Sequence, residues 1–294
     1  MQQMFFEKLS IHFLVAASAS AFTSPTIHRR RHPLYAGVAA TSVDNVVILP
    51  DADAVGNKVR GVVYEAAKKA IGERGYFSLA IPGGSILNML IGDDILGDWT
   101  EKTTIAYVNH KCVDMNDGNL ATHAKARKLF LDSWKGANTL VLDGTDQGEA
   151  EAASYEAKMK ELTLEVLPRD ASGLPIFDLA LIGVGDDGHI GSLYPGRNEV
   201  LVGSDGPWVL PVAMKDPPSI TFSLPIMANS KQVIIAACGV SDKYPQGKSA
   251  GMRRAVAADD ETLQTFPAVG LRSVATWVMD EAAASKLGED YIQK

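Results

Sequence analysis

The chain has 294 residues, of which 46% are hydrophobic, 21% charged and 7% aromatic. These values are ordinary for a folded globular chain and exclude collagen-like, coiled-coil and largely disordered proteins. A net charge of −7 makes nucleic acid and anionic membrane surfaces poor partners, so we expect neither. The two cysteines, Cys112 and Cys238, are too few for a disulfide framework and form no C-x-x-C zinc pattern.

Residues 1–43 differ in composition from the rest of the chain. They hold four basic residues and one acidic residue, a net charge of +3 in a chain whose total is −7. The apolar run 11–17 is far shorter than the roughly 20 residues that a membrane-spanning helix needs. A small-residue site of the kind that signal peptidase cuts follows at 19–21, and the stretch after it is hydroxyl-rich, basic and free of acids, as in transit peptides.

This two-part pattern resembles the bipartite presequences of algae with secondary, red-lineage plastids. We therefore expect residues 1–43 to be a presequence, disordered or removed, and residues 44–294 to be a single α/β domain. The mature protein would lie in the plastid stroma, without membrane attachment. An ordinary secretory signal or a disordered tail is the alternative interpretation of residues 1–43, and the cytoplasm is the alternative location.

Hydrophobic patterns in the body alternate between strands and helices. In chain order they predict a strand at 46–49, a helix at 55–70, a strand at 76–81 with a helix starting near 86, a strand at 103–108, a helix at 121–134, a strand at 139–142, a helix at 148–163, strands at 177–182 and 232–237, a helix from about 248, a strand at 274–279 and a helix at 281–287. This alternation indicates a three-layer α/β fold, with a mostly parallel, doubly wound sheet and helices on both faces. Ligands bind at the carboxyl ends of such strands, so the loops after residues 81, 108, 182 and 237 are the candidate site.

The first of these loops contains Gly83, Gly84 and Ser85 before the predicted helix. Two glycines let the backbone approach an anion closely, and a helix start offers N–H groups to it. The pattern is consistent with phosphate binding. A tight turn in which Ser85 only caps the helix is the alternative.

The loop after 182 contains a G-x-G-x-x-G pattern that ends in His189. The pattern resembles a dinucleotide fingerprint, but Asp186 and Asp187 would stand where a pyrophosphate must lie, so we exclude a nicotinamide cofactor. Histidine can take up and give back a proton near neutral pH, so His189 can act as a general base. A histidine that caps the next helix or fills a polar niche is the alternative.

The loops after 108 and 237 carry lysines that could face an anion. Lys111 could stabilise an oxyanion. His110, Cys112 and His123 could suggest a metal site, but their spacing fits no standard ligand set. Strand alternation also places the side chains of Asn109 and Lys111 on the face opposite those of His110 and Cys112. Near residue 248 the sequence resembles the end of a P-loop, but Asp242 stands where its first glycine should be, so we exclude a nucleotide cradle.

Several segments together resemble the 6-phosphogluconolactonases. They are the Gly83-Gly84-Ser85 loop, the run 177–196, the run 220–225, the Gly239 loop and the run 277–284. The most specific part reads Asp-Gly-His-x-x-Ser-Leu-Tyr-Pro-Gly from Asp187, and the resemblance extends from about residue 46 to the end. This family is similar in fold to glucosamine-6-phosphate deaminase. A deaminase would read Asn-Glu-Pro where this chain has Leu193-Tyr194-Pro195, which favours the lactonase.

The resemblance implies hydrolysis of 6-phospho-D-glucono-1,5-lactone to 6-phosphogluconate, in the oxidative branch of the pentose phosphate pathway. The enzyme would be a carboxylic ester hydrolase with no metal and no organic cofactor, and its partner would be the small sugar phosphate lactone. We expect the catalytic residues to be His189, Asp187 and Lys111, and the substrate- or phosphate-binding residues to be Gly83, Gly84, Ser85, Asn119, Gly188, Ser192, Lys248 and its rival Lys243.

Some positions depart from the pattern of that family. Its usual Asp-Glu-Arg is Asn109-His110-Lys111 here, and its arginine before Ile220 is Ser219. Asn119 matches the asparagine of a Ser-Asn-Tyr triplet whose other two members differ. Lys111 keeps a positive charge but lacks the two-pronged fork of arginine.

These departures leave two rival functions. A non-catalytic sugar phosphate sensor on the same fold is motivated by the altered segment 109–111. A glucosamine-6-phosphate deaminase would need its proton-shuttling carboxylate at Asn109, and asparagine cannot serve in that role.

Overall fold

The computed structural model describes residues 45–239, 247–288 and 291, so the predicted presequence 1–43 and Lys243 lie outside the described residues. A seven-stranded sheet organises the fold, and all its neighbouring pairs are parallel. In spatial order its strands are β1 (Val46–Leu49), β10 (Ala275–Asp280), β9 (Val233–Ala237), β6 (Leu179–Ile182), β2 (Phe77–Ile81), β3 (Thr103–Tyr107) and β5 (Asn138–Thr139). The predicted mostly parallel sheet is confirmed.

The central strands are buried along their whole length because both their faces are covered. Every residue of β2, β3, β6 and β9 is buried, and β6 and β9 are also apolar throughout. Such strands are typical of parallel sheets that have layers on both sides.

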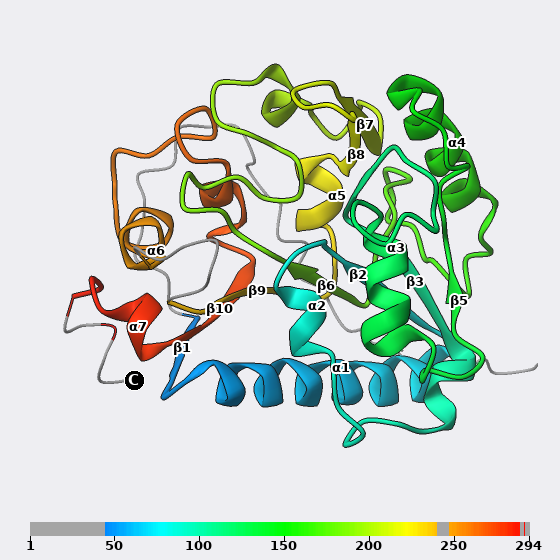
Figure 1. The fold of residues 1–294 in the computed structure, drawn as a ribbon, viewed down its shortest axis with the longest axis horizontal. Coiled ribbons are helices and arrows are strands. Elements are labelled where there is room, and N and C mark those ends of the chain that lie inside the picture. The colour runs from blue at the N-terminus through cyan, green and yellow to red at the C-terminus, as the bar shows by residue number, and fades with distance from the viewer. Residues whose placement is uncertain (1–44, 240–246, 289–290, 292–294) are drawn as a thin grey trace, which may run out of the picture. The chain divides into compact units, whose positions relative to one another are not determined.

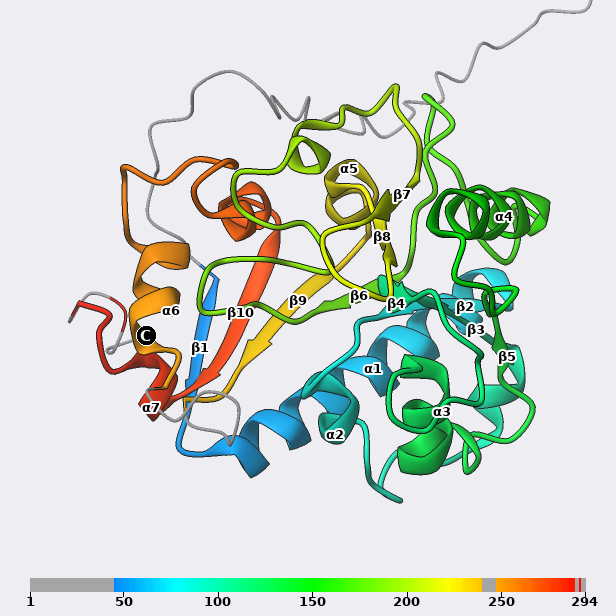
Figure 2. The ribbon, with the colours of Figure 1, turned by 45° about the horizontal axis from the view of Figure 1, so that its top comes forward.

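Helices and a second sheet supply those covering layers. The long helix α1 (Ala52–Arg74) runs along one face of the large sheet, while α5 (Leu224–Ala228) lies with the second sheet over the other face (Figures 1 and 2). The α1 helix begins where the Asp51 carboxylate accepts a hydrogen bond from the Ala54 N–H at 2.8 Å, and it ends at Gly75, whose φ is +88°. A side-chain N-cap and a left-handed glycine are the expected ends of such a helix.

The second sheet has three antiparallel strands, which the sequence did not predict. Its order is β4 (Asn109–Lys111), β8 (Ser219–Phe222) and β7 (Val209–Val212), and α4 (Gly148–Glu161) packs against it. Short strands that contain polar residues such as Asn109, Lys111 and Ser219 show too little hydrophobic pattern to be recognised. Pro211 further disguises β7, and proline is tolerated there because β7 is an edge strand.

Other elements differ from prediction mainly in length. The predicted helix 121–134 is divided into α3 (Thr122–Ala126) and a π-helical turn, Arg127–Leu131. Its apolar stripe is nevertheless buried, since hydrophobic spacing within one turn does not distinguish an α-turn from a π-turn. The remaining helices are short: α2 (Ile86–Met89), α6 (Ser249–Val256), α7 (Glu281–Ala284) and the 3₁₀ turns Asp98–Lys102, Asn198–Leu201 and Pro267–Leu271. Among the described residues, no helix has the length and apolarity needed to span a membrane.

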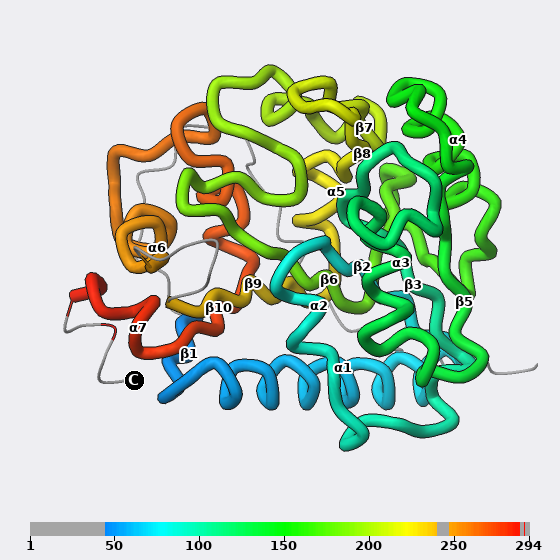
Figure 3. The backbone as a smooth tube through the Cα atoms, in the orientation of Figure 1, coloured from blue at the N-terminus to red at the C-terminus, as the bar shows by residue number. Residues whose placement is uncertain are grey.

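The strand order of the large sheet reverses between β2 and β6. From β2 the chain moves outward through β3 to β5, whereas from β6 it moves the other way through β9 to β10. Figure 3 follows the backbone out of β2 into α2 and out of β6 into the long connection to β7. Such a reversal opens a crevice at the carboxyl ends of the two strands, which is where ligands bind in this class of sheet.

Candidate active site

Two loops meet at this crevice. One follows β2 and contains Gly83, and the other follows β6 and begins at Gly183. A Cβ atom placed on Gly183 would lie 4.0 Å from the Gly83 carbonyl oxygen. The structure therefore brings the glycine loop (residues 82–85) beside the histidine loop (residues 183–189).

Gly84 and Ser85 form the exposed part of the glycine loop. Gly84 has φ +85°, a conformation that favours glycine. The Ser85 hydroxyl makes no capping hydrogen bond to α2, which speaks against a purely capping role. Within the described part of the chain, neither the Gly84 nor the Ser85 N–H donates to a protein acceptor. Because α2 is a single turn with a small dipole, these local N–H groups are what the loop offers an anion.

Asn109 connects the glycine loop to Ser192, which follows the histidine loop in the chain. Its Oδ1 accepts a hydrogen bond from the Gly83 N–H at 3.3 Å, and its Nδ2 donates to the Ser192 Oγ at 3.3 Å. One amide thus uses both its acceptor and its donor. Since the Gly83 N–H is engaged by Asn109, the N–H groups that this loop keeps for the predicted anion are those of Gly84 and Ser85.

His189 and Asp187 form the candidate catalytic pair. The Asp187 Oδ1 lies 2.6 Å from the His189 Nδ1 and also accepts the His189 N–H at 3.1 Å. The hydrogen bond from His189 lowers the pKa of Asp187 to about 2, so this carboxylate is ionised at neutral pH. An ionised carboxylate can only accept, so the proton of a neutral imidazole sits on Nδ1 and Nε2 is left as the base. The His189 side chain is 21% exposed, enough to meet a ligand.

Two glycines shape the turn that presents this pair. A Cβ on Gly185 would lie 2.1 Å from the His189 Nδ1, so only glycine permits the observed position of the ring. Gly188 has φ +84°, and its N–H and carbonyl both bond to the protein, through Gly185 O and the Ala268 N–H. Gly188 therefore helps to build the turn, and its role as a substrate-binding residue stays a prediction.

Ser192 is buried and connects Asn109 to Thr221, while its predicted contact with the substrate stays a prediction. It is 4% exposed, its hydroxyl accepts from Asn109, and its N–H donates to the Thr221 Oγ1 at 3.0 Å. Thr221 and Asn109 are direct partners across β4 and β8, so their side chains share one face of the second sheet. The sequence carried no signal for Thr221, because its contact with Ser192 joins residues 29 apart.

Lys111 lies on the same face of β4 as Asn109. The predicted alternation is confirmed, since Asn109 and Lys111 are half-buried and His110 between them is buried. Among the described residues Lys111 forms no ion pair. The Lys111 side chain therefore leaves β4 on the face that also carries Asn109.

Asn119 is exposed in the loop that leads to α3. Its N–H donates to the Asp117 Oδ1 at 2.8 Å, which orders this loop. Thr122, at the start of α3, approaches the glycine loop, because a Cβ on Gly83 would lie 3.0 Å from its Oγ1. Asn119 thus belongs to a segment that borders the glycine loop.

Lys248 is buried at the start of α6, with an exposed fraction of 6%. Its ammonium donates to the Val184 carbonyl at 3.0 Å. This contact joins α6 to the histidine loop, so Lys248 supports that loop from within the protein. Lys243, the alternative phosphate contact, lies outside the described residues.

A buried polar chain lies behind β4. The His123 N–H donates to the His110 Nε2 at 3.0 Å, and the His110 Nδ1 bonds to the Lys111 carbonyl at 2.6 Å. Burial lowers the pKa of His110 to about 4, so it is neutral at pH 7. The Tyr107 hydroxyl completes the chain at 2.8 Å from the His123 Nδ1. Among the described residues no group of three or more His, Cys, Asp or Glu side chains is arranged to hold a metal ion.

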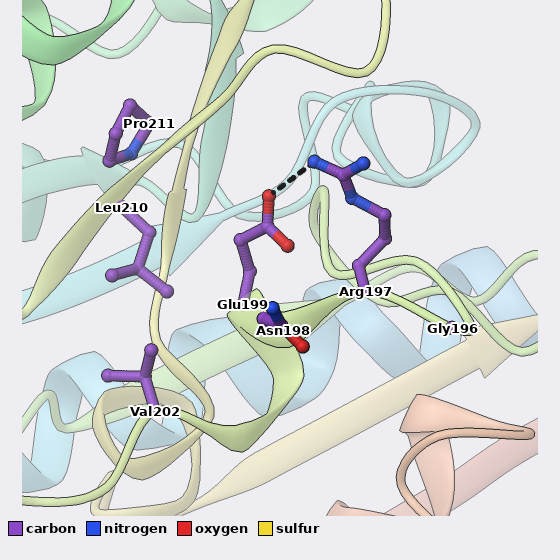
Figure 4. A pocket seen from close by; sticks show the side chains of 7 residues that line it. All are labelled: Gly196, Arg197, Asn198, Glu199, Val202, Leu210 and Pro211. Carbon is purple, nitrogen blue, oxygen red and sulfur yellow. Dashed lines mark hydrogen bonds and ion pairs between the residues drawn. The ribbon is translucent and has the colours of Figure 1, made fainter.

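A depression of about 460 Å³ lies between the β6–β7 connection and β7 (Figure 4). Arg197 faces Glu199 across it, with Nη2 and Oε1 2.9 Å apart. Its other lining residues are Gly196, Asn198, Val202, Leu210 and Pro211. None of the predicted site residues lines this depression, so the candidate chemistry is located at the two loops instead.

Comparison with known proteins shows which family the chain is similar to. A family model described as glucosamine-6-phosphate isomerases/6-phosphogluconolactonase matches residues 50–278. The chain is 30% identical over 238 residues to the chloroplastic 6-phosphogluconolactonase 3 of Arabidopsis thaliana, covering 73% of this chain and 66% of that relative.

Solved structures share the fold. A 6-phosphogluconolactonase from Leishmania guyanensis superposes with a TM-score of 0.67 at 19% identity, over 83% of this chain and 98% of that one. A monomeric glucosamine-6-phosphate deaminase superposes with a TM-score of 0.63 at 17% identity, over 82% of this chain and 99% of that one. At these identities the likeness concerns the fold alone.

Proposed function

Because the chain belongs to the family of glucosamine-6-phosphate isomerases and 6-phosphogluconolactonases, we propose that it hydrolyses 6-phospho-D-glucono-1,5-lactone to 6-phosphogluconate. One observation carries the proposal. The His189–Asp187 pair stands beside a glycine loop whose exposed Gly84 and Ser85 offer N–H groups to an anion. A base next to an anion site is what hydrolysis of a phosphorylated ester requires.

The phosphate of the substrate docks on the glycine loop. The N–H groups of Gly84 and Ser85 and the Ser85 hydroxyl donate to its oxygens. In a chain of net charge −7, a dianion also needs a local cation, for which Lys243 and Lys248 are the candidates. To serve, Lys248 would have to turn its ammonium away from the Val184 carbonyl. Docking there places the lactone ring over the histidine loop.

His189 then handles the proton of the attacking water. Its Nε2 removes a proton from water as the oxygen attacks the lactone carbonyl, while Asp187 holds the Nδ1–H and stabilises the imidazolium. Lys111 steadies the oxyanion. The proton on Nε2 passes to the ring oxygen as its bond to the carbonyl carbon breaks, and the new carboxylic acid ionises into solvent. General-base action of this kind accounts for roughly 10²–10⁴-fold in rate.

The rival functions have less support. A deaminase would need a carboxylate at residue 109, and the Asn109 amide is instead engaged with Gly83 and Ser192. A non-catalytic sensor would not need a base whose ring is fixed by Asp187 and by the absence of a side chain at Gly185.

The same proposal covers domain and location. Residues 44–294 would be the mature catalytic domain, acting in the plastid stroma after removal of 1–43. The basic composition of residues 1–43, which hold a single acidic residue, and the chloroplastic relative support this assignment. Import of a fluorescent fusion carrying residues 1–43 into plastids would test it, and retention in the cytoplasm would contradict it.

The decisive experiment is a lactone hydrolysis assay on the purified protein, corrected for spontaneous ring opening. We expect hydrolysis above the spontaneous rate, and a fall in kcat of at least 10²-fold in His189→Ala with little change in binding of 6-phosphogluconate. Asp186→Asn, which removes the exposed neighbouring carboxylate, is the matched control. Binding of 6-phosphogluconate without hydrolysis would favour the sensor, and ammonia release from glucosamine 6-phosphate would favour the deaminase.

A further inference from the structure

A tyrosine ring lies over the candidate base. The Tyr194 and His189 ring centroids are 4.8 Å apart with an angle of 33° between the planes. Gly185 and Asp187 hold the Nδ1 edge of the imidazole. A ligand that reaches Nε2 therefore enters alongside Tyr194.

A lysine from a different part of the chain covers Tyr194. Lys215, in the connection between β7 and β8, places its Nζ 3.1 Å from the Tyr194 hydroxyl and 4.7 Å from the ring centroid. Lys215 is exposed, and among the described residues it forms no ion pair. It is thus a cation without a carboxylate partner, one aromatic ring away from the base.

We propose that Lys215 binds the carboxylate that the reaction creates, and that it thereby makes the site selective for the acid-bearing sugar phosphate. This inference rests on the proposed lactone hydrolysis. Tyr194 positions the ammonium by accepting it at both its ring face and its hydroxyl.

The chemistry of hydrolysis places a new charge near Lys215. Attack of water on the lactone carbonyl forms one carbon–oxygen bond and breaks the bond to the ring oxygen, which takes the proton from His189. The carbonyl carbon then carries two oxygens that share one negative charge. The oxygen that comes from water lies at Nε2, under Tyr194, while the original carbonyl oxygen faces Lys111 in the proposed mechanism. Lys215 and Lys111 would therefore flank the carboxylate, with Lys215 on the side of the water-derived oxygen.

Asp186 and Asp187 make a cation on this side necessary. Both carboxylates are exposed beside His189, and each repels a forming carboxylate. Arg254 is close enough to Asp187 to feel its charge, but it is already paired with Glu261 and stacked on a phenylalanine ring. Lys215 is the exposed cation that contacts the aromatic cover of the base.

The test compares two ligands that differ in one group. D-Glucitol 6-phosphate has the same carbon chain and phosphate as 6-phosphogluconate, with an alcohol in place of the carboxylate. Dissociation constants of both are measured by titration calorimetry on the full-length protein and on Lys215→Met, which keeps the apolar stem against Tyr194. We expect the unmodified protein to bind 6-phosphogluconate about tenfold tighter than the polyol phosphate, as for a hydrogen bond to a charged group. In Lys215→Met that preference should shrink to about twofold or less, with the affinity for the polyol phosphate unchanged.

Two further variants and one activity measurement separate the outcomes. Lys215→Arg should restore the preference, and Lys58→Met, which removes an exposed lysine of α1, should leave it unchanged. An unaltered preference in Lys215→Met, or an equal loss for both ligands, would overturn the assignment, since the first excludes a carboxylate contact and the second indicates a phosphate or structural role. Lactone hydrolysis is measured on the same unmodified sample. Absence of hydrolysis contradicts the proposed function, whereas hydrolysis with an unaltered preference contradicts only the role of Lys215.

Discussion

Lys111 lies directly opposite Ser219 in the antiparallel pair of β4 and β8. In the family that the chain resembles, arginine is usual at both positions, so two departures that are far apart in the sequence fall on one cross-strand pair. Side chains of such a pair are close neighbours on one face of the sheet. This chain therefore has one cation, Lys111, at a cross-strand pair where the usual pattern of the family would place two.

A second cation at this pair should strengthen binding of the anionic substrate. We expect Ser219→Arg to lower the KM for the lactone by roughly three- to tenfold, because its guanidinium can donate two hydrogen bonds to one anion. The gain should weaken at high salt. Steady-state kinetics at two ionic strengths measure it. Ser219→Gln adds length without charge and should leave KM unchanged, and an equal effect of both substitutions would argue against a charge effect.

The Asn109 amide should matter for alignment rather than for proton transfer. Asn109→Ala removes the hydrogen bonds to Gly83 and Ser192, and we expect kcat to fall by about tenfold as the two loops lose their register. Asn109→Asp keeps an acceptor for both the Gly83 N–H and the Ser192 hydroxyl, so its kcat should stay within about threefold of the original. Full activity in Asn109→Ala would show that the hydrogen bonds of Asn109 to Gly83 and Ser192 are dispensable.

The histidine loop should tolerate no side chain at Gly185. In Gly185→Ala the new methyl group would overlap the His189 ring, so the ring must move away from Asp187, and we expect kcat to fall by about 10²-fold or more. Gly61→Ala is the control, because a Cβ there meets open space and alanine favours the helix interior by about 0.5–1 kcal/mol. Steady-state kinetics give kcat for both variants, and thermal unfolding shows whether both are folded. A Gly185→Ala enzyme with normal kcat would contradict the observed ring position.

Acid should destabilise the fold through His110. Its pKa is about 4 in the folded protein and near 6.5 when unfolded, so the unfolded chain takes up the proton first. The stability contributed by this group is therefore present above pH 6.5 and lost as pH falls toward 4. Between pH 7 and pH 5 the free energy of unfolding should drop by about 2 kcal/mol from this residue alone.

Urea titrations at those two pH values measure the loss. His110→Gln can still accept from the His123 N–H and donate to the Lys111 carbonyl, but it does not titrate. Between pH 7 and pH 5, the unfolding free energy of His110→Gln should therefore drop by about 2 kcal/mol less than that of the unmodified protein. If the unfolding free energies of the two proteins depended on pH to the same extent, His110 would not be the cause of the acid destabilisation.

Much of the fold could be predicted because strands such as β6 and β9 are continuous apolar runs and α1 has a clear hydrophobic period. The strands β2 and β9 and the helix α4 lie within a residue or two of their predicted bounds. The second sheet could not be predicted, since strands as short as β4 owe their existence to pairing with β8, a partner far away in the chain.

By itself the sequence determined the chemistry that the site has available. Glycines after β2, the histidine with an acid two residues before it and the lysine at 111 were identifiable, because each follows a strand end and ligands bind at strand ends. Only the tertiary structure decided how these groups are used. It engages the backbone of Gly188 and the hydroxyl of Ser192 in hydrogen bonds within the protein and places Tyr194 over His189. The reason is physical: which hydrogen-bonding groups remain available to a ligand depends on what the folded protein has already paired, and those partners lie far apart along the chain.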